Sequence, residues 1–286
     1  MRMRYKPLIF SLLIFFTISC GPKKLTDEEL AQQHLAKSEK LFNSNEINAA
    51  KMQIDTINKF FEKQVAVRKK ANTLSYNIQL IEQKKNLIYA DSVIKIKQRE
   101  VDSIAKNFKF EKDTAYEDLG NYVYKSQRVE NTLGGTFIRA YVDEKGKLYL
   151  SSLYCSKVPL KHFSARFTIG DIFAETEKVT DDGYNHSFKD GEATFETVIY
   201  KSNANKEIGT LVQQNSGKTI VVTLQGEKRK ATFLLTSNEK KAISEACNLS
   251  VYLTDLKNLE RIITVSKKKI ILLEENLRQD KEDSKQ

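Results

Sequence analysis

The amino-acid sequence predicts an α+β fold: an antiparallel β-sandwich inserted between an N-terminal helical hairpin plus long helix and a long C-terminal helix. Turn-forming residues are confined to the middle of the chain. Apart from Gly21, every glycine lies between Gly120 and Gly226, and Pro159 is the only proline after Pro22. On both sides of this middle region, apolar residues recur every three or four positions, which is the spacing of a buried helix face.

The first helices follow from a capping signal and a break. Thr26 and Glu29 have the spacing of a capping box, so we expect a helix from there to about Phe42. Residues 43–45 interrupt it, and an apolar stripe that begins at Ile47 predicts a second short helix. The two helices should form a hairpin.

Two longer apolar stripes predict two long helices. The first runs from Val67 to Phe108, and the second runs from Ala242 to Leu277 after a capping-box signature at 236–239. We expect the two helices to pack antiparallel, as a coiled-coil-like stalk.

The predicted boundaries are a signal peptide at 1–19, a helical region at 20–110, a β-sandwich at 111–236, a long helix at 237–280 and a frayed tail at 281–286.

The middle region alternates apolar and polar positions, the pattern of strands buried on one face. Between positions 137 and 142, Ile138, Ala140 and Val142 form the apolar set. About eight to ten short strands fit this length, in a sandwich rather than an open barrel. The predicted turns are Asp143-Glu144-Lys145-Gly146, Gly170-Asp171, Asp181-Asp182-Gly183, Asp190-Gly191, Ser216-Gly217 and Gln225-Gly226.

The amino terminus has the layout of a secretory signal: Arg2, Arg4 and Lys6 precede an apolar run that ends at Phe16. The run is shorter than the roughly 20 residues that a membrane-spanning helix needs. Ser19-Cys20-Gly21 resembles the lipobox of bacterial lipoproteins, with Thr17 where leucine is usual. The resemblance implies cleavage before Cys20 and lipidation (palmitate) of its thiol. The alternative is an ordinary cleaved signal.

The layout of the whole chain resembles lipoproteins of Bacteroidota that join a lipobox, helices and a β-sandwich. This resemblance implies no particular activity. Surface-exposed members carry acidic residues after the cysteine, whereas Gly21-Pro22-Lys23-Lys24 follows here. The resemblance therefore implies a cell-envelope protein, anchored in the outer membrane and facing the periplasm.

The segment 36–60 is similar to a single tetratricopeptide-type hairpin, with Asn45 where that family prefers glycine. Stacked repeats need about three units to bury a continuous core. One repeat favours core packing over peptide binding.

The formal net charge is +10, and the basic surplus lies in the first helical third. A basic surplus often marks nucleic-acid binding. Here the charges are interleaved with acids in an exported chain, so we expect a solvated helix face and no nucleic-acid partner. Attraction to anionic lipid headgroups is the alternative.

The search for chemistry yields no catalytic, cofactor-binding or metal-binding residue. The three histidines are His34, His162 in a position beside a strand, and His186 in an expected turn. A serine-hydrolase elbow and a helical zinc motif are both absent from the sequence. Three weaker candidates remain: a Cys155–His162 pair, a calcium-type loop at 181–185 and the carboxylates of Glu192 and Glu196.

Cys155 and Cys247 are either two buried thiols or a disulfide, which export would permit. The tyrosines of the β region, Tyr141, Tyr149, Tyr154, Tyr184 and Tyr200, favour a core or sheet-surface role over a ligand platform.

The sequence thus predicts a membrane-anchored envelope lipoprotein without enzymatic activity, a scaffold or binding module for another envelope protein or a glycan. The alternatives are a hydrolase of glycan or peptide that uses loop carboxylates of the β domain, and a purely structural spacer.

Overall fold

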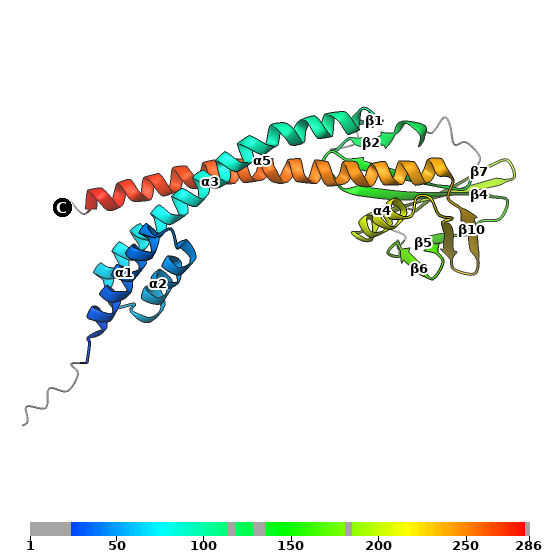
Figure 1. The fold of residues 1–286 in the computed structure, drawn as a ribbon. Coiled ribbons are helices and arrows are strands. Elements are labelled where there is room, and N and C mark those ends of the chain that lie inside the picture. Colours follow the sequence, from blue (N-terminus) through cyan, green and yellow to red (C-terminus); the bar gives the residue numbers. More distant parts are fainter. Residues whose placement is uncertain (1–23, 114–117, 128–134, 181–184, 284–286) are drawn as a thin grey trace, which may run out of the picture. The chain divides into compact units, whose positions relative to one another are not determined.

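The computed structural model describes residues 24–113, 118–127, 135–180 and 185–283. The chain is a mixed α+β protein with two antiparallel sheets, as the sequence predicts (Figure 1). The predicted signal peptide with Cys20 lies outside the described residues, and so do positions 181–184 of the expected turn and calcium-type loop. None of the described helices is long and apolar enough to span a membrane.

The chain divides into two compact units. The first consists of Met1–Ile81 with Leu272–Gln286, and the second of Glu82–Ile271. Two long helices, α3 (Val65–Ala105) and α5 (Ser237–Asp283), contribute to both units. Helix α5 is therefore three residues longer than the sequence predicts at its C-terminal end.

In the first unit, α1 (Asp27–Asn43) and α2 (Ile47–Phe60) form the expected hairpin. The capping box is present, because the Glu29 N–H donates to Thr26 Oγ1 (3.2 Å) and the Thr26 N–H donates to the Glu29 carboxylate (2.8 Å). These bonds satisfy backbone donors that have no partner inside the helix.

Asn45 forms the turn of this hairpin in the left-handed region, with φ of 61°. Its N–H donates to the Phe42 carbonyl, and the Glu46 N–H donates to the Leu41 carbonyl. Asparagine is one of the few residues other than glycine that adopt this conformation at low cost. The chain can therefore reverse within three residues.

The first unit has its own core, to which α1, α2 and the start of α3 contribute. Its buried members are Ala31, Leu35, Ala50, Ile54, Ile57, Val67, Ala71 and Ile78. Helix α3 thus covers the apolar face of the hairpin.

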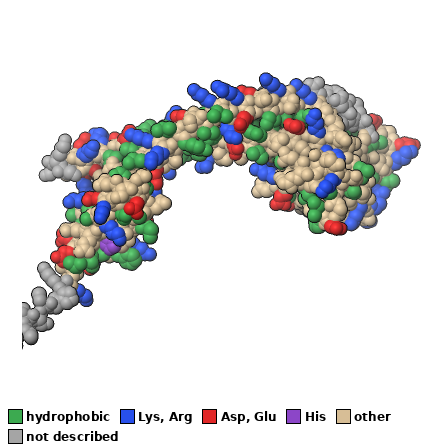
Figure 2. All heavy atoms as spheres, viewed as in Figure 1, with side chains coloured by type: hydrophobic (Ala, Val, Ile, Leu, Met, Phe, Trp, Pro, Cys, Tyr) green, Lys and Arg blue, Asp and Glu red, His purple; other side chains and the backbone are tan. Residues whose placement is uncertain are grey.

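The two long helices run antiparallel within each unit. The contacts that give this direction are Lys69–Asp283 (3.0 Å) and Thr73–Asp280 (2.7 Å) in the first unit, and Gln83–Ser266 (3.0 Å) and Lys97–Asp255 (3.7 Å) in the second. Lysine and arginine side chains are spread along these helices, with acidic and hydrophobic side chains among them (Figure 2).

The second unit holds both sheets. The six-stranded sheet has the order β1-β2-β3-β4-β8-β7 and the four-stranded sheet the order β10-β9-β5-β6, with all neighbours antiparallel. The strands are β1 (Phe108–Glu111), β2 (Asn121–Tyr124), β3 (Phe137–Asp143), β4 (Leu148–Ser156), β5 (His162–Ile169), β6 (Ile172–Glu175), β7 (Asn185–Asp190), β8 (Ala193–Tyr200), β9 (Val221–Gly226) and β10 (Lys230–Leu234).

The core of the second unit lies on the inward face of the six-stranded sheet. Ile138, Ala140 and Val142 of β3 are fully buried there, which confirms the predicted alternation. The first half of α5 covers this face (Figure 1) through Ala242, Ala246, Leu249, Leu253 and Leu256. The four-stranded sheet adds Ala165, Phe167, Val222 and Leu224 to the same core.

Glu239 joins the start of α5 to β3. Its carboxylate accepts the Thr236 N–H (2.8 Å) as part of the predicted second capping box, and it also accepts the Ile138 N–H (2.8 Å). Glu239 is only 7% exposed. A single carboxylate therefore caps the helix and fixes a strand beneath it.

The region that we expected to consist of strands also contains a helix, α4 (Ala204–Gln214). Ile208 and Val212 are fully buried on one face of α4, and Gly209 lies against Cys247. The segment is only 11 residues long and contains a glycine, so its helical spacing is difficult to recognise. The Ser216-Gly217 turn follows this helix instead of joining two strands.

The predicted turn at Gln225-Gly226 is wrong, because both residues belong to β9. The chain turns after them, and the Gly226 N–H donates to the Arg229 carbonyl (3.0 Å). A Cβ at position 226 would lie 2.3 Å from the Leu160 carbonyl oxygen. Glycine is needed here for the close approach of two backbones, not for a turn.

The turns at Asp143–Gly146, Gly170-Asp171 and Asp190-Gly191 are confirmed between strands. Gly146, Gly170 and Gly191 all have positive φ.

Candidate functional site

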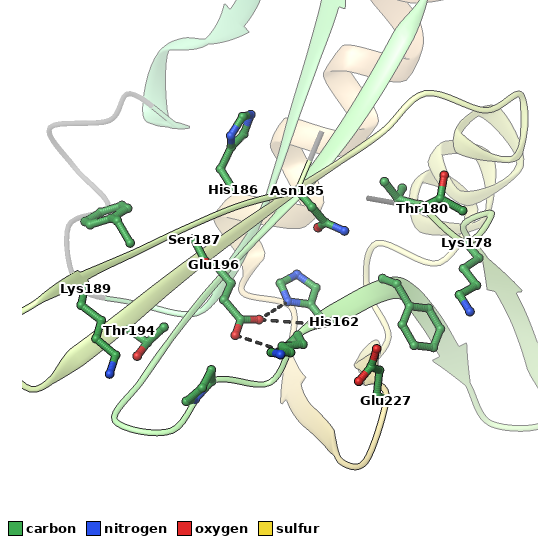
Figure 3. Close-up of a pocket in the computed structure, with 15 residues that line it drawn as sticks. His162, Lys178, Thr180, Asn185, His186, Ser187, Lys189, Thr194, Glu196 and Glu227 are labelled. Carbon is green, nitrogen blue, oxygen red and sulfur yellow. Dashed lines mark hydrogen bonds and ion pairs between the residues drawn. The ribbon is translucent and has the colours of Figure 1, made fainter. Parts of the chain in front are cut away.

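A cleft of about 740 Å³ opens in the second unit at the β7–β8 end of the six-stranded sheet (Figure 3). One wall is the β7–β8 hairpin, with Asn185, Ser187, Lys189, Thr194 and Glu196. The opposite wall is the start of β5 and the segment after β6, with Phe163, Lys178, Val179 and Thr180. The cleft therefore lies where the edge of one sheet faces the other sheet.

The residue types on β7 account for the opening. Asn185, Ser187 and Lys189 are paired with Val198, Glu196 and Thr194 of β8, so they share the inward face of the sheet. A strand packed against a second sheet would carry apolar residues at these positions. Because β7 carries polar residues there, its inward face stays solvated.

Two residues of the cleft lining, His162 and Glu196, belong to a chain of hydrogen-bonded side chains that continues behind the cleft. Ser152 Oγ lies 2.7 Å from His162 Nε2 and 2.8 Å from Tyr200 Oη. His162 Nδ1 lies 3.0 Å from Glu196 Oε2, as Figure 3 shows. Ser152 is 0%, His162 2% and Glu196 4% exposed.

Glu196 also holds the backbone at the start of β5. Its carboxylate accepts the N–H groups of Leu160 (2.7 Å), Lys161 (2.9 Å) and His162 (3.4 Å). Lys161 has φ of 51°, a left-handed conformation that costs a residue with a Cβ roughly 1–2 kcal/mol. The buried carboxylate thus stabilises a strained corner at the rim of the cleft.

Burial and hydrogen bonding determine the protonation states of this network. Burial lowers the pKa of His162 and outweighs the raising effect of Glu196, so the ring is neutral at neutral pH. Burial alone would raise the pKa of Glu196, but the backbone N–H of Lys161, the His162 ring and further backbone N–H groups together lower it. Burial also raises the pKa of Tyr200.

The protons of the network can therefore be assigned by elimination. Because Glu196 is ionised, the neutral His162 ring donates from Nδ1 and accepts at Nε2. The Ser152 hydroxyl then donates to Nε2, and the Tyr200 hydroxyl donates to Ser152 Oγ. Every donor in the chain has an acceptor, which is the condition for a stable buried polar network.

The order serine, histidine, carboxylate is that of a nucleophile, a base and an orienting acid. Nucleophilic attack, however, requires that the serine oxygen reach a substrate. Ser152 is fully buried and its oxygen is shared with Tyr200. In this structure the three groups hold one another, and Ser152 does not line the cleft.

The solvent-facing charge of the cleft is positive. Its described lining contains three lysines, Lys161, Lys178 and Lys189. It contains two acids, the buried Glu196 and Glu227. The Lys178 ammonium lies 4.4 Å from the centre of the Phe163 ring, a cation–π contact on the apolar part of the wall.

Of the residues singled out from the sequence, the structure brings His162 and Glu196 together. Cys155 and His162 do not form the pair that we considered, because Cys155 lies on the face of β4 opposite to Ser152, the residue that contacts His162. Glu192 is on the exposed hairpin turn and pairs with Lys157, so Glu192 and Glu196 form no carboxylate pair across a cleft.

The remaining candidates lie elsewhere. His34 is in the first unit, where its Nδ1 lies 2.8 Å from Gln53 Oε1. His186, expected in a turn, belongs to β7. Cys155 and Cys247 are both free thiols, and burial raises the pKa of Cys247. In the described part of the chain, no group of three histidine, cysteine or acidic side chains is placed to hold a metal.

Sequence reasoning missed Ser152, and it assigned Tyr200 only a core or sheet-surface role. Both stand at inward positions of alternating strands, Ser152 two residues after the buried Leu150. A polar residue at an inward position indicates a buried hydrogen bond. The partners of Ser152, however, are ten residues away (His162) and 48 residues away (Tyr200) in the sequence, and only the fold brings them together.

Comparison of the chain with protein-family models, with curated proteins and with solved structures finds no match.

Proposed function

We propose that this chain is a lipoprotein of the bacterial cell envelope, anchored through Cys20, whose β region binds another envelope component in the cleft without converting it. The anchor would hold the protein in the outer membrane with the mature chain in the periplasm. The lipobox-like Ser19-Cys20-Gly21 supports the anchor.

The observation that carries the binding role is the cleft together with the hydrogen-bonded side chains beneath it. Its volume of about 740 Å³ falls within the range of roughly 300–1,000 Å³ typical of small-molecule sites. Ser152 and His162, which could act as a nucleophile and a general base, are hydrogen-bonded to each other, and His162 is also bound to Glu196. Such a network favours a rigid binding surface over a reactive one.

In this proposal the two sheets are the layers of an antiparallel β-sandwich inserted between the helices. The common core of both sheets supports that arrangement. The layers would be closed where β3 and β4 meet α5 and open where β7 faces the start of β5. The long helices would serve as a scaffold that carries the sandwich.

The anchor can be tested by growing cells with an alkyne-tagged palmitate. We expect label on the wild type and on Cys155→Ala, and none on Cys20→Ala. An unlabelled wild-type chain would favour the ordinary cleaved signal.

The binding role can be tested in intact cells with a photoreactive benzoylphenylalanine at position 187, inside the cleft. The matched control carries it at position 232, exposed on the edge strand β10. We expect a defined crosslinked component from position 187 that is absent from position 232. Equal capture at the two positions, or none at 187, would contradict the role of the cleft.

A hydrolase is the second candidate, favoured by the Ser152–His162–Glu196 order. Incubation with a fluorophosphonate, followed by intact-mass measurement, separates the two. We expect no adduct, because Ser152 is fully enclosed. An adduct on Ser152, lost in Ser152→Ala, would instead support the hydrolase.

A further inference from the structure

Thr194 of β8 is a buried residue of the cleft wall whose hydroxyl has no partner among the described residues. The side chain is 4% exposed, and its Oγ1 makes no hydrogen bond to any described residue. Buried hydroxyls of the four-stranded sheet and its connections do have partners: Ser164 donates to Glu175, and Thr176 Oγ1 accepts the Ala165 N–H. An unsatisfied buried hydroxyl is costly, so a native structure that keeps one calls for an explanation.

Lys189 stands directly opposite Thr194 in the β7–β8 register, so both side chains share the inward face. Figure 3 places the two next to each other on the same wall. Directly opposed residues of an antiparallel pair have Cβ atoms roughly 5 Å apart. Lys189 is exposed and forms no ion pair with a described residue. A hydroxyl donor and an ammonium donor thus lie within reach of one small group.

The two glutamates of the β7–β8 hairpin are engaged with other groups, and Glu227, the other acid of the described lining, is on the β9–β10 turn. Glu196 is bound by His162 and by three backbone N–H groups, and Glu192 on the adjoining turn is paired with Lys157. The opposite wall adds the Lys178 ammonium and the apolar surface of Phe163 and Val179. The cleft therefore offers donors at one side and an aromatic surface at the other.

We propose that the cleft binds a small organic anion. Its carboxylate, sulfate or phosphate accepts from the Thr194 hydroxyl and the Lys189 ammonium, and its apolar part lies against Phe163 and Val179. The inference rests on the proposed binding role of the cleft and adds the chemical class of the ligand. Hydrogen bonds to charged groups are the strong ones, and they give such a site its selectivity for anions over neutral analogues.

The test compares 2-naphthoate with its neutral isostere 2-naphthamide, by calorimetric titration of the full mature chain in detergent. We expect naphthoate to bind at least about tenfold more tightly, the size expected for charged hydrogen bonds. Lys189→Gln and Thr194→Val should each weaken naphthoate binding about fivefold or more without affecting naphthamide. Lys145→Gln, an exposed lysine on the β3–β4 turn, is the matched control and should change neither.

Thermal melting of each variant verifies folding, and Thr194→Val keeps the shape of the side chain so that the core is preserved. Equal affinity for the two probes, unchanged naphthoate binding in both variants, or no naphthoate binding by the folded wild type would each overturn the anionic site. Equal affinity would leave the proposed binding role intact. That role fails separately, if position 187 captures nothing in cells.

Discussion

One row of side chains across the six-stranded sheet passes from a closed core to an open cleft. Ile138, Ser152, Val198 and Asn185 are successive cross-strand neighbours on the inward face of β3, β4, β8 and β7. The first three are at most 1% exposed, whereas Asn185 is half-buried. Successive side chains point to opposite faces of the sheet on all four strands. What differs is the residue type, and that difference separates covered sheet from binding surface.

The largest expected effect concerns Glu196, which lies at the boundary between the two regions. Glu196→Ala leaves three backbone N–H groups and the His162 ring without their acceptor, and should lower the free energy of unfolding by about 3–5 kcal/mol. Glu192→Ala, on the exposed turn of the same hairpin, should change it by less than about 0.5 kcal/mol. Urea denaturation measures both. Similar values for the two would refute the anchoring role of Glu196.

The contrast between the covered inward face of β3 and the open inward face of β7 predicts the next largest effect on stability. Ile138→Ala removes three carbons from a fully buried position beneath α5 and should cost about 3 kcal/mol. Ser187→Ala, at an exposed inward position of β7, should stay within about 0.5 kcal/mol. The midpoints of chemical denaturation give the difference, and a large cost at Ser187 would mean that the inward face of β7 is covered.

The buried network also predicts acid sensitivity. The folded pKa of His162 is below its ordinary value of 6.5, so as pH falls through that value the unfolded chain binds a proton that the folded chain does not. Stability should therefore fall on acidification below about pH 6.5. The lowered pKa of Glu196 adds a second loss of the same sign below about pH 4.5.

Thermal melting between pH 8 and pH 4 checks this dependence. His162→Gln should remove the first loss and keep the second. A wild-type melting temperature that rises as pH falls from 7 to 5 would contradict the assignment of a neutral, buried ring.

The smallest expected effect concerns the strained corner at the rim. Lys161→Gly removes the Cβ penalty at φ of 51° but adds backbone freedom to the unfolded chain, so we expect a net stabilisation of about 0.5 kcal/mol. Calorimetric melting resolves a shift of this size. A loss of more than about 1 kcal/mol would mean that the lysine side chain itself stabilises the corner.

The helices on either side of the β region could be predicted from the sequence because their signals are local, although α3 ends at Ala105 and the stripe that we followed to Phe108 continues into β1. Each capping box joins residues three positions apart, as in Thr26 with Glu29, and apolar stripes repeat within a few turns. The strands of the middle region were predicted for the same reason. Asn45 also marked the hairpin turn, where it adopts the left-handed conformation.

The cleft could not be predicted, because its parts are brought together only by sheet pairing. Glu196 reaches back 34 residues to His162, and Gly226 meets a carbonyl of Leu160 across two strands. A glycine that permits close packing and a glycine that permits a turn look alike in one sequence. The polar inward positions of β7 were the readable signal, but they immediately follow turn-forming residues.

The carboxylate of Glu239 has a consequence for the order in which this chain can fold. It binds an amide in β3 that precedes it by 101 residues, and the core of β3 is completed by the helix that begins there. Contacts so far apart in sequence form late, since a long loop must close first. A polypeptide emerging amino end first can assemble the α1–α2 hairpin at once. Its sheets must wait, with their apolar faces uncovered, until the last fifth of the chain has been delivered.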